Sequence, residues 1–208
     1  MNKDGIDYAK KVYRFTYEEA KEDCDNEVAV LMLLDHPNTI KYFDHFISDQ
    51  GLFTIITEFA PNGTLQDILD KEQLRPKTEP EILRYFTMIV QGVNYLHGVG
   101  IIHRDLKPDN IFMGIDGLLK IGDYGLSKIL SHSKKYASSK YVRTAPIFKA
   151  PELIRNKGHR DKVDEWALGV ILYFMCSQKW PYDADDEVGL INFIKSKKRF
   201  HKRIATVT

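Results

Sequence analysis

The sequence predicts an α+β fold in which a small, β-rich part is followed by a larger, mainly helical part. Two segments, Tyr8–Tyr13 and Leu52–Phe59, are rich in β-branched and aromatic residues and are predicted to be strands. One helical pattern separates them. Beyond residue 60 the apolar spacing is mainly helical, and a single hairpin signal interrupts it. With 208 residues, 43% of them hydrophobic, the chain is expected to form one domain around one core.

The helix between the two strands is predicted to run from Glu18 to Leu34. It should end before Pro37, because proline disfavours helical geometry in the residue that precedes it. Five residues at three- and four-residue spacings share one face of this helix: Cys24, Glu27, Val28, Leu31 and Leu34. Glu27 therefore lies on the apolar face, where a carboxylate needs a partner.

A second helix is predicted to begin after Thr78 and to end near residues 98–100. Thr78 and Glu81 form a capping-box pattern, in which a hydroxyl and a carboxylate satisfy backbone amides at the start of a helix. The buried stripe of this helix is predicted to contain Phe86, Ile89, Val93 and Leu96. The helix leads directly into a charged motif.

That motif is His-Arg-Asp-Leu-Lys-Pro-Asp-Asn, residues 103–110, and apolar residues lie on both sides of it. Because these neighbours hold the motif against the core, we expect a site there and not a solvated loop. Downstream, the Asp116-Gly117 turn between apolar segments predicts a β-hairpin that ends just before Asp123. Asp105, Asn110 and Asp123 are therefore expected to be neighbours.

Two carboxylates and an amide oxygen in one place suit Mg²⁺. This cation prefers oxygen ligands and usually completes its shell with water and phosphate oxygens. Lys107, which lies within the same motif, would then face the phosphates.

Composition argues against several other function classes. The net charge of +1 gives no overall field for nucleic acid or an anionic membrane, so neither is expected as a partner. Cys24 and Cys176 are too far apart in the sequence to indicate a disulfide framework or a zinc site. The start of the chain does not resemble a signal peptide, and the apolar run 166–176 is shorter than the roughly 20 residues that cross a bilayer.

We therefore expect a cytoplasmic protein, with the nucleus as the alternative. The basic stretch 195–203 is expected to be a solvated helix end, and a nuclear-localisation or phosphate-binding patch is the competing reading.

Several short motifs occur in an order that resembles the eukaryotic protein kinases. They are Ala9-Lys10-Lys11, Glu27, Thr57-Glu58-Phe59-Ala60, residues 103–110, Asp123-Tyr124-Gly125, Ala150-Pro151-Glu152 and residues 164–169. Any one of them could arise by chance, whereas the ordered set is specific. The resemblance covers nearly the whole chain and implies a two-lobed, protein-kinase-like fold.

The resemblance implies that the chain binds ATP and Mg²⁺. Lys11 would hold the α- and β-phosphates and pair with Glu27, while Asn110 and Asp123 would hold the metal. The other residues that it assigns to the nucleotide are Ala9, Thr57, Glu58, Ala60, Thr64 and Phe112.

The same resemblance implies a reaction. Asp105 would orient the acceptor hydroxyl and take its proton, and Lys107 would stabilise the γ-phosphate. The context of Lys107, together with Thr144 before the Ala-Pro-Glu motif, resembles the Ser/Thr branch of the family. Protein substrates with serine or threonine acceptors are therefore expected.

Regulation by phosphorylation is a further expectation. Arg104 resembles the arginine that binds a phosphorylated activation segment, and Ser138 and Ser139 lie nearest the usual spacing before Thr144. Thr144 is assigned to the same regulatory group. The alternative is a polar loop in which these serines are incidental.

The sequence departs from the family at both ends. No glycine-rich phosphate loop precedes Lys11, and the last helices of the large lobe are missing. We therefore expect a partial kinase domain over residues 1–208. Its small-lobe remnant, residues 1–60, would hold the third to fifth strands and one helix, and its large lobe, residues 61–208, the catalytic loop and activation segment. Without the glycine-rich loop, weak binding of ATP–Mg²⁺ is expected.

Two internal positions also differ from the family pattern. Tyr124 replaces the usual phenylalanine and adds a hydroxyl that must find a partner if it is buried. Arg143 stands where many relatives have glycine. Neither change removes a catalytic group.

The leading functional hypothesis is thus a protein Ser/Thr kinase. A catalytically weak or inactive kinase-like binding protein is the main alternative, favoured by the short length. A kinase acting on small molecules is a third reading, and the Ala-Pro-Glu segment argues against it because it resembles a peptide-positioning segment.

Overall fold

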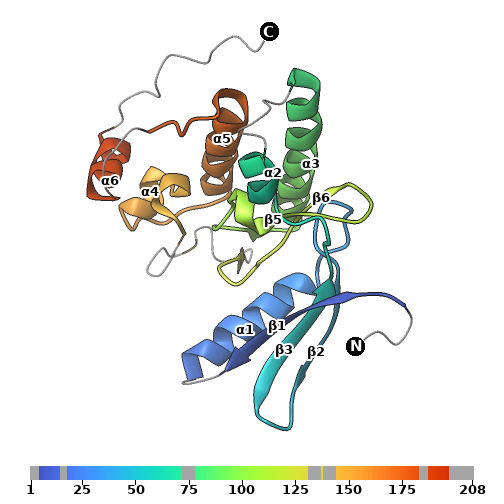
Figure 1. The fold of residues 1–208 in the computed structure, drawn as a ribbon. Helices are drawn as coiled ribbons and strands as arrows, with labels where there is room; N and C mark the ends of the chain where they lie inside the picture. The colour runs from blue at the N-terminus through green and yellow to red at the C-terminus, as the bar shows by residue number, and fades with distance from the viewer. Residues whose placement is uncertain are drawn as a thin grey trace.

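The computed structural model describes residues 5–14, 18–71, 78–130, 137, 144–182 and 187–196. A small sheet with one helix forms the amino-terminal part, and a larger, mainly helical part follows it (Figure 1). The fold is therefore α+β with two lobes, as predicted. Ser138, Ser139 and Arg143 lie outside the described residues.

The small sheet has three antiparallel strands: β1 (Tyr8–Arg14), β2 (Tyr42–Ile47) and β3 (Leu52–Glu58), in the order β1-β3-β2. Strands β1 and β3 occupy the predicted segments. Along β1 the burial alternates, with Lys11 and Tyr13 on the covered face and Val12 exposed. This is the two-residue periodicity of a half-buried strand.

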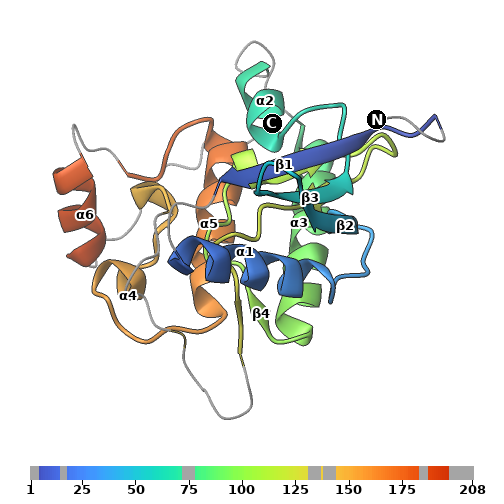
Figure 2. The same cartoon turned by 90° about the horizontal axis from the view of Figure 1, so that it is seen from below.

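Helix α1 (Glu18–Leu31) lies beside this sheet (Figures 1 and 2). Its predicted face is buried, Glu27 included, and its apolar members share one core with the strand residues Phe53 and Ile55. The helix ends three residues before the predicted Leu34. The reason is visible in the backbone, because the amide of Leu34 bonds to the carbonyl of Leu31 and no longer to the fourth residue back.

The larger part is built on two long helices that pack together, α3 (Glu79–Gly98) and α5 (Lys162–Ser177). The shorter helices are α2 (Leu65–Lys71), α4 (Pro151–Ile154), α6 (Glu187–Lys195), and the 3-10 turns η2 (Pro108–Asn110) and η3 (Pro146–Phe148). At the start of α3 the Thr78 amide donates to Glu81 Oε2 over 2.8 Å, so the predicted capping box is confirmed.

Two short ladders lie on either side of the charged motif. Strand β4 (Ile101–Ile102) pairs with β7 (Lys128–Ile129), and β5 (Ile111–Met113) pairs with β6 (Leu119–Ile121). The second pair is the predicted hairpin, with Gly117 at a φ of 74° in its turn. The motif is thus anchored at both ends in ordered structure.

Close packing of α3 on β6 fixes the hairpin. A Cβ at Gly92 of α3 would lie 2.7 Å from the Asn38 oxygen and 2.8 Å from Ile121 Cδ1, so only glycine allows this approach. In the parts of the chain that the structure describes, no helix is both long and apolar enough to cross a membrane.

Candidate active site

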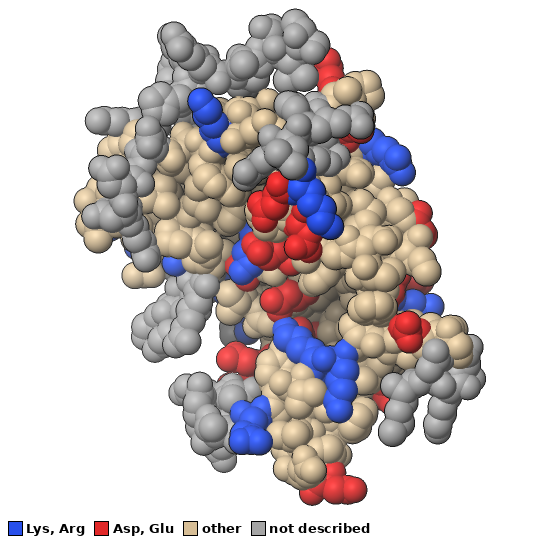
Figure 3. Space-filling model, viewed as in Figure 1, with Lys and Arg blue, Asp and Glu red and all other residues tan. Residues whose placement is uncertain are grey.

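A cleft of about 380 Å³ lies between the small sheet and the helical part. Its walls include every residue assigned from the sequence to the nucleotide except Thr64. The cleft residues come from β1, α1, β3, β5 and the segment after β6, so the fold brings together positions that are far apart in the chain. Figure 3 shows acidic side chains gathered near the hollow between the two parts.

Thr64 lies beside the cleft and is engaged elsewhere. Its amide and its hydroxyl both donate to Asp67 Oδ2, over 2.7 and 2.8 Å, at the start of α2. Its backbone bridges to Phe112, which does line the cleft. A contact between Thr64 and the nucleotide stays a prediction.

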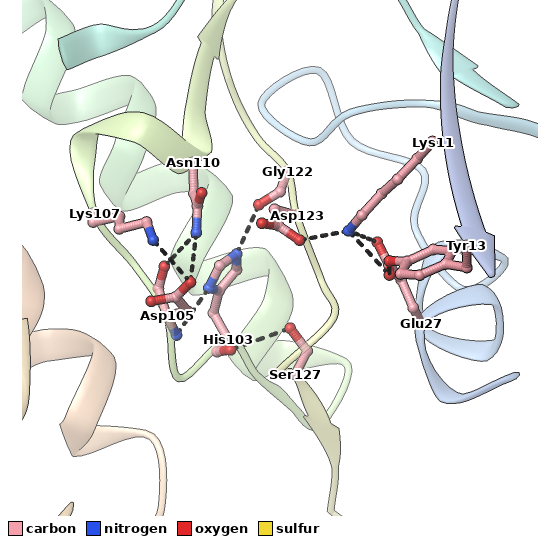
Figure 4. A network of polar contacts seen from close by, with 10 residues as sticks. All are labelled: Lys11, Tyr13, Glu27, His103, Asp105, Lys107, Asn110, Gly122, Asp123 and Ser127. Atoms are coloured by element: carbon pink, nitrogen blue, oxygen red, sulfur yellow. Dashed lines mark hydrogen bonds and ion pairs between the residues drawn. The ribbon is translucent and has the colours of Figure 1, made fainter. Parts of the chain in front are cut away.

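Lys11 is the centre of an ion-pair network within the cleft (Figure 4). Its Nζ lies 2.9 Å from Glu27 Oε1 and 2.7 Å from Asp123 Oδ1. Burial alone would lower the pKa of Lys11, but the charges of Glu27 and Asp123 outweigh it and raise the pKa well above its usual range. Lys11 therefore stays charged, and the expected ion pair with Glu27 is present.

Asp123 is the exposed carboxylate of this network, whereas Glu27 is buried. Its side chain is 41% exposed, and its φ of 57° lies in the left-handed region. Burial would raise its pKa, but the charge of Lys11 prevails and lowers the pKa below its ordinary value. An ionised carboxylate thus faces the cleft.

Asp105 is held by its neighbours through one oxygen only (Figure 4). Asn110 Nδ2 donates to Asp105 Oδ2 over 2.9 Å, and Lys107 Nζ lies 3.3 Å from the same oxygen. Asp105 Oδ1 is buried and has no hydrogen-bond partner among the described residues. Asp105 and Asp123 line one hollow of about 260 Å³. The predicted neighbours therefore lie together, and one oxygen of Asp105 lacks a hydrogen-bond partner among the described residues.

Asp164 of α5 explains how the charged motif keeps its shape. This carboxylate is fully buried and accepts hydrogen bonds from the backbone amides of His103 and Arg104, each over 2.9 Å. His97 Nε2 lies 2.8 Å from it. Arg104 has a φ of 67°, a strained value for a non-glycine residue that these contacts can maintain.

Arg104 and Thr144, two residues proposed to be regulatory, are placed within the large lobe. Arg104 Nε donates to the Leu126 carbonyl over 2.6 Å, and burial lowers the pKa of its guanidinium. Thr144 is buried, and its hydroxyl has no hydrogen-bond partner within the described ranges.

Tyr124 satisfies its extra hydroxyl. The side chain is fully buried, and the hydroxyl donates to the Ile121 carbonyl over 2.7 Å. The expectation that this group must find a partner is confirmed.

Sequence reasoning missed Tyr13. Its hydroxyl donates to Glu27 Oε2, beside the bond from Lys11 (Figure 4). The spacing held a usable signal, because a residue two positions after Lys11 on a strand points to the same face.

The donor set fits one Mg²⁺ with an ATP molecule. The described residues contain no group of three or more His, Cys, Asp or Glu that could hold a metal by themselves. Asp123 and the amide oxygen of Asn110 would provide two oxygen ligands, and Mg²⁺ bound with a triphosphate typically needs few from the protein. The cleft walls are mainly apolar, which suits a flat base.

A cleft between a small sheet and a helical lobe, lined by a lysine paired with two carboxylates, is typical of phosphotransferases of the protein kinase type. The family described as "Protein kinase domain" matches residues 1–206. This chain belongs to the protein kinase family.

Three of the curated relatives that this chain resembles are named serine/threonine-protein kinases. Probable serine/threonine-protein kinase nek3 of Dictyostelium discoideum is 40% identical over 177 residues, which cover 82% of this chain and 16% of that protein. Serine/threonine-protein kinase Nek8 of Danio rerio is 40% identical over 173 residues, or 82% of this chain and 24% of the relative. Cell cycle serine/threonine-protein kinase CDC5/MSD2 of Saccharomyces cerevisiae is 34% identical over 184 residues, 86% of this chain and 25% of the relative. The chain thus spans about a quarter or less of each of these three relatives.

Proposed function

We propose that this chain is the catalytic part of a protein Ser/Thr kinase that transfers the γ-phosphate of ATP to protein hydroxyls. The observation that carries the proposal is the geometry of Asp105. Asn110 and Lys107 fix one of its oxygens, and the other has no hydrogen-bond partner in the described part of the chain. A fixed carboxylate with one unpaired oxygen can accept the hydrogen of a substrate hydroxyl.

The chain's own residues divide the work between them. Asp105 orients the hydroxyl oxygen toward the phosphoryl group and accepts its proton. The new oxygen–phosphorus bond forms as the bond between the γ-phosphorus and the β-phosphate oxygen breaks, and ADP is the leaving group. Lys107, 3.3 Å from Asp105, supplies positive charge beside the transferred group. Lys11, held by Glu27, fixes the α- and β-phosphates. Bound ATP supplies the phosphoryl group, and bound Mg²⁺ neutralises charge on it.

Adenine recognition is assigned to the strand end at Glu58 and the segment that follows it. Thr57, Glu58 and Ala60 line the cleft on this side, and Phe112 lines it on the hairpin side. The base would be held between apolar walls, with backbone groups of the connecting segment available for hydrogen bonds.

Regulation by Arg104, and a cytoplasmic location without nucleic-acid or membrane partners, stay predictions from the sequence. Phosphate on Ser138 or Ser139 would offer Arg104 a charged partner. Phosphopeptide mass spectrometry of active protein tests this point, and active protein without phosphate at either serine would contradict it.

Asp105→Asn tests the proposed function directly. The amide oxygen of asparagine can still accept from Asn110, so the fold and ATP affinity should survive, but the group no longer accepts a proton. Transfer of phosphate from ATP to a basic peptide with one serine should fall about 10²- to 10⁴-fold.

Asp109→Asn is the matched control, because it makes the same chemical change on an exposed residue of the same motif. Its rate should equal that of the parent. If Asp105→Asn keeps more than about a tenth of the parental rate, Asp105 is not the base. A parent without transfer activity would favour the kinase-like binding protein.

A further inference from the structure

The buried carboxylate of Glu27 is held by two side chains of one strand. Lys11 Nζ lies 2.9 and 3.2 Å from its two oxygens, and the Tyr13 hydroxyl donates to Oε2. Lys11 and Tyr13 are two residues apart on β1, so both point from the same face of the sheet toward α1 (Figure 4).

The hydroxyl of Tyr13 is protonated and can therefore donate a hydrogen bond. Burial, and then the charge of Glu27, raises the pKa of Tyr13 well above its usual range, so the phenol keeps its proton. Glu27 is only 3% exposed, and a buried carboxylate with too few donors is costly. Lys11 Nζ also lies 5.2 Å from the centre of the Tyr13 ring, within range of a cation–π contact.

Lys11 does not hold Glu27 alone, because its ammonium group is shared between two carboxylates. The same ammonium lies 2.7 Å from Asp123, closer than its 2.9 Å to Glu27. If Glu27 moved away, Lys11 would be left with Asp123, the residue assigned to the metal. In the described structure the Tyr13 hydroxyl donates to Glu27 and not to Asp123, so this bond is not shared with the metal-site residue.

We infer that Tyr13 is a positioning residue for nucleotide binding, which acts by holding Glu27 where Lys11 can reach both Glu27 and the phosphates of ATP. The inference rests on the proposed function. It concerns the hydroxyl group of Tyr13, since a phenyl ring alone would fill the same space.

Tyr13→Phe removes that hydroxyl and keeps the ring. The dissociation constant for ATP–Mg²⁺, measured by calorimetry, and the KM for ATP should both rise about three- to tenfold, as expected for the loss of one hydrogen bond to a charged group. The KM for the peptide should change less than about twofold, because Tyr13 lies on the nucleotide side. A merely structural role would not separate the two constants in this way.

Tyr8→Phe is the matched control. Tyr8 lies on the same strand and packs edge-to-face on Phe43, with ring centres 4.9 Å apart. Loss of the Tyr8 hydroxyl should leave the dissociation constant for ATP–Mg²⁺ and the KM for ATP unchanged.

A double variant tests whether Tyr13 acts through Glu27. In the Glu27→Ala background, Tyr13→Phe should change ATP affinity by less than about twofold, because effects that share one group are not additive. Full additivity would overturn the inference, and so would parental ATP affinity in Tyr13→Phe alone.

Thermal unfolding curves of each variant show whether it is folded. Tyr13→Leu, which lacks both the ring and the hydroxyl, should show at least the same rise in the ATP constants while remaining folded. Unfolding of both Tyr13 variants would make the side chain structural and would overturn the inference. A parent that does not bind ATP–Mg²⁺ would instead contradict the proposed function.

Discussion

Asp105 and Asp123 are carboxylates of one hollow with different surroundings. The Asp105 side chain is 9% exposed and is fixed by an amide and an ammonium group. The Asp123 side chain is 41% exposed and is paired with Lys11. A fixed, partly unpaired carboxylate suits proton acceptance, whereas an exposed, ionised one can exchange its partner for a cation. The difference in burial thus supports the two separate roles proposed for these residues.

Tyr124→Phe tests the contribution of the extra hydroxyl. The Ile121 carbonyl also accepts from the Ile40 amide over 2.8 Å, so it keeps one partner when the hydroxyl is removed. We expect the free energy of unfolding to fall by about 0.5–1 kcal/mol, the lower part of the range for a buried hydrogen bond. Urea unfolding beside Tyr8→Phe checks this. A variant more stable than the parent would show that the bond to Ile121 does not stabilise the fold.

The sequence predicted Lys11, Glu27, Asp105, Asn110 and Asp123 as one site because each occupies a motif position, and for Glu27 because a carboxylate on an apolar face needs a partner. It could not reveal which oxygen of Asp105 stays unpaired, since that depends on where Asn110 and Lys107 fold. Tyr13 was missed for a related reason. A tyrosine in a half-buried strand is ordinary, and its bond to Glu27 exists only once α1 has packed.

At the level of elements, periodic segments were predicted well and non-periodic ones were not. Helix α3 begins after Thr78 and ends at Gly98 as expected, because its capping box and buried stripe are local signals. Strand β2 was expected only as one of three small-lobe strands, and its residues were left unassigned. All its residues except Tyr42 are exposed, so no alternation marks it. This strand forms because it pairs with β3, and no local pattern in residues 42–47 predicts that pairing.

A double-mutant cycle tests the ion pair between Lys11 of β1 and Glu27 of α1. Lys11→Met and Glu27→Ala each break the same ion pair, so we expect each to lower kcat/KM for ATP by a similar factor. The double variant should be little worse than either single one, because the two residues act as a unit. Arg14→Met is the control, since Arg14 is an exposed cation of β1 that does not line the cleft. Fully additive losses would mean that one of the two assignments is wrong.

At the scale of the whole molecule, ion pairs connect the two lobes at separate points. Lys11 of β1 reaches Asp123 of the large lobe. Lys120 of β6, which is buried, reaches Glu58 at the end of β3 over 3.1 Å and Asp116 over 3.2 Å. The Lys11–Asp123 pair lies inside the cleft, and the Lys120–Glu58 pair lies where the chain leaves β3 for the large lobe. Charged contacts between the two lobes therefore lie at two edges of the cleft.

Protonation of Asp123 should weaken the first of these contacts. Its pKa is lowered by folding, so the folded state binds this proton less readily than the unfolded chain. The stability it contributes is therefore complete above the ordinary pKa of 3.8 and is lost as the pH falls through the lowered value. Because the side chain is 41% exposed, water screens the pair, and we expect a contribution below about 1 kcal/mol.

Asp123→Asn measures this contribution. Urea unfolding of the parent and the variant at neutral pH should give a small difference in the free energy of unfolding, and the difference should shrink as the pH is lowered from about 5 to about 3. Added salt should reduce it at neutral pH, since the pair is partly exposed. Asp109→Asn, which neutralises an exposed carboxylate, should show no such dependence on pH. A gap between Asp123→Asn and the parent that stays constant across this range would mean that the charge of Asp123 does not join the two lobes.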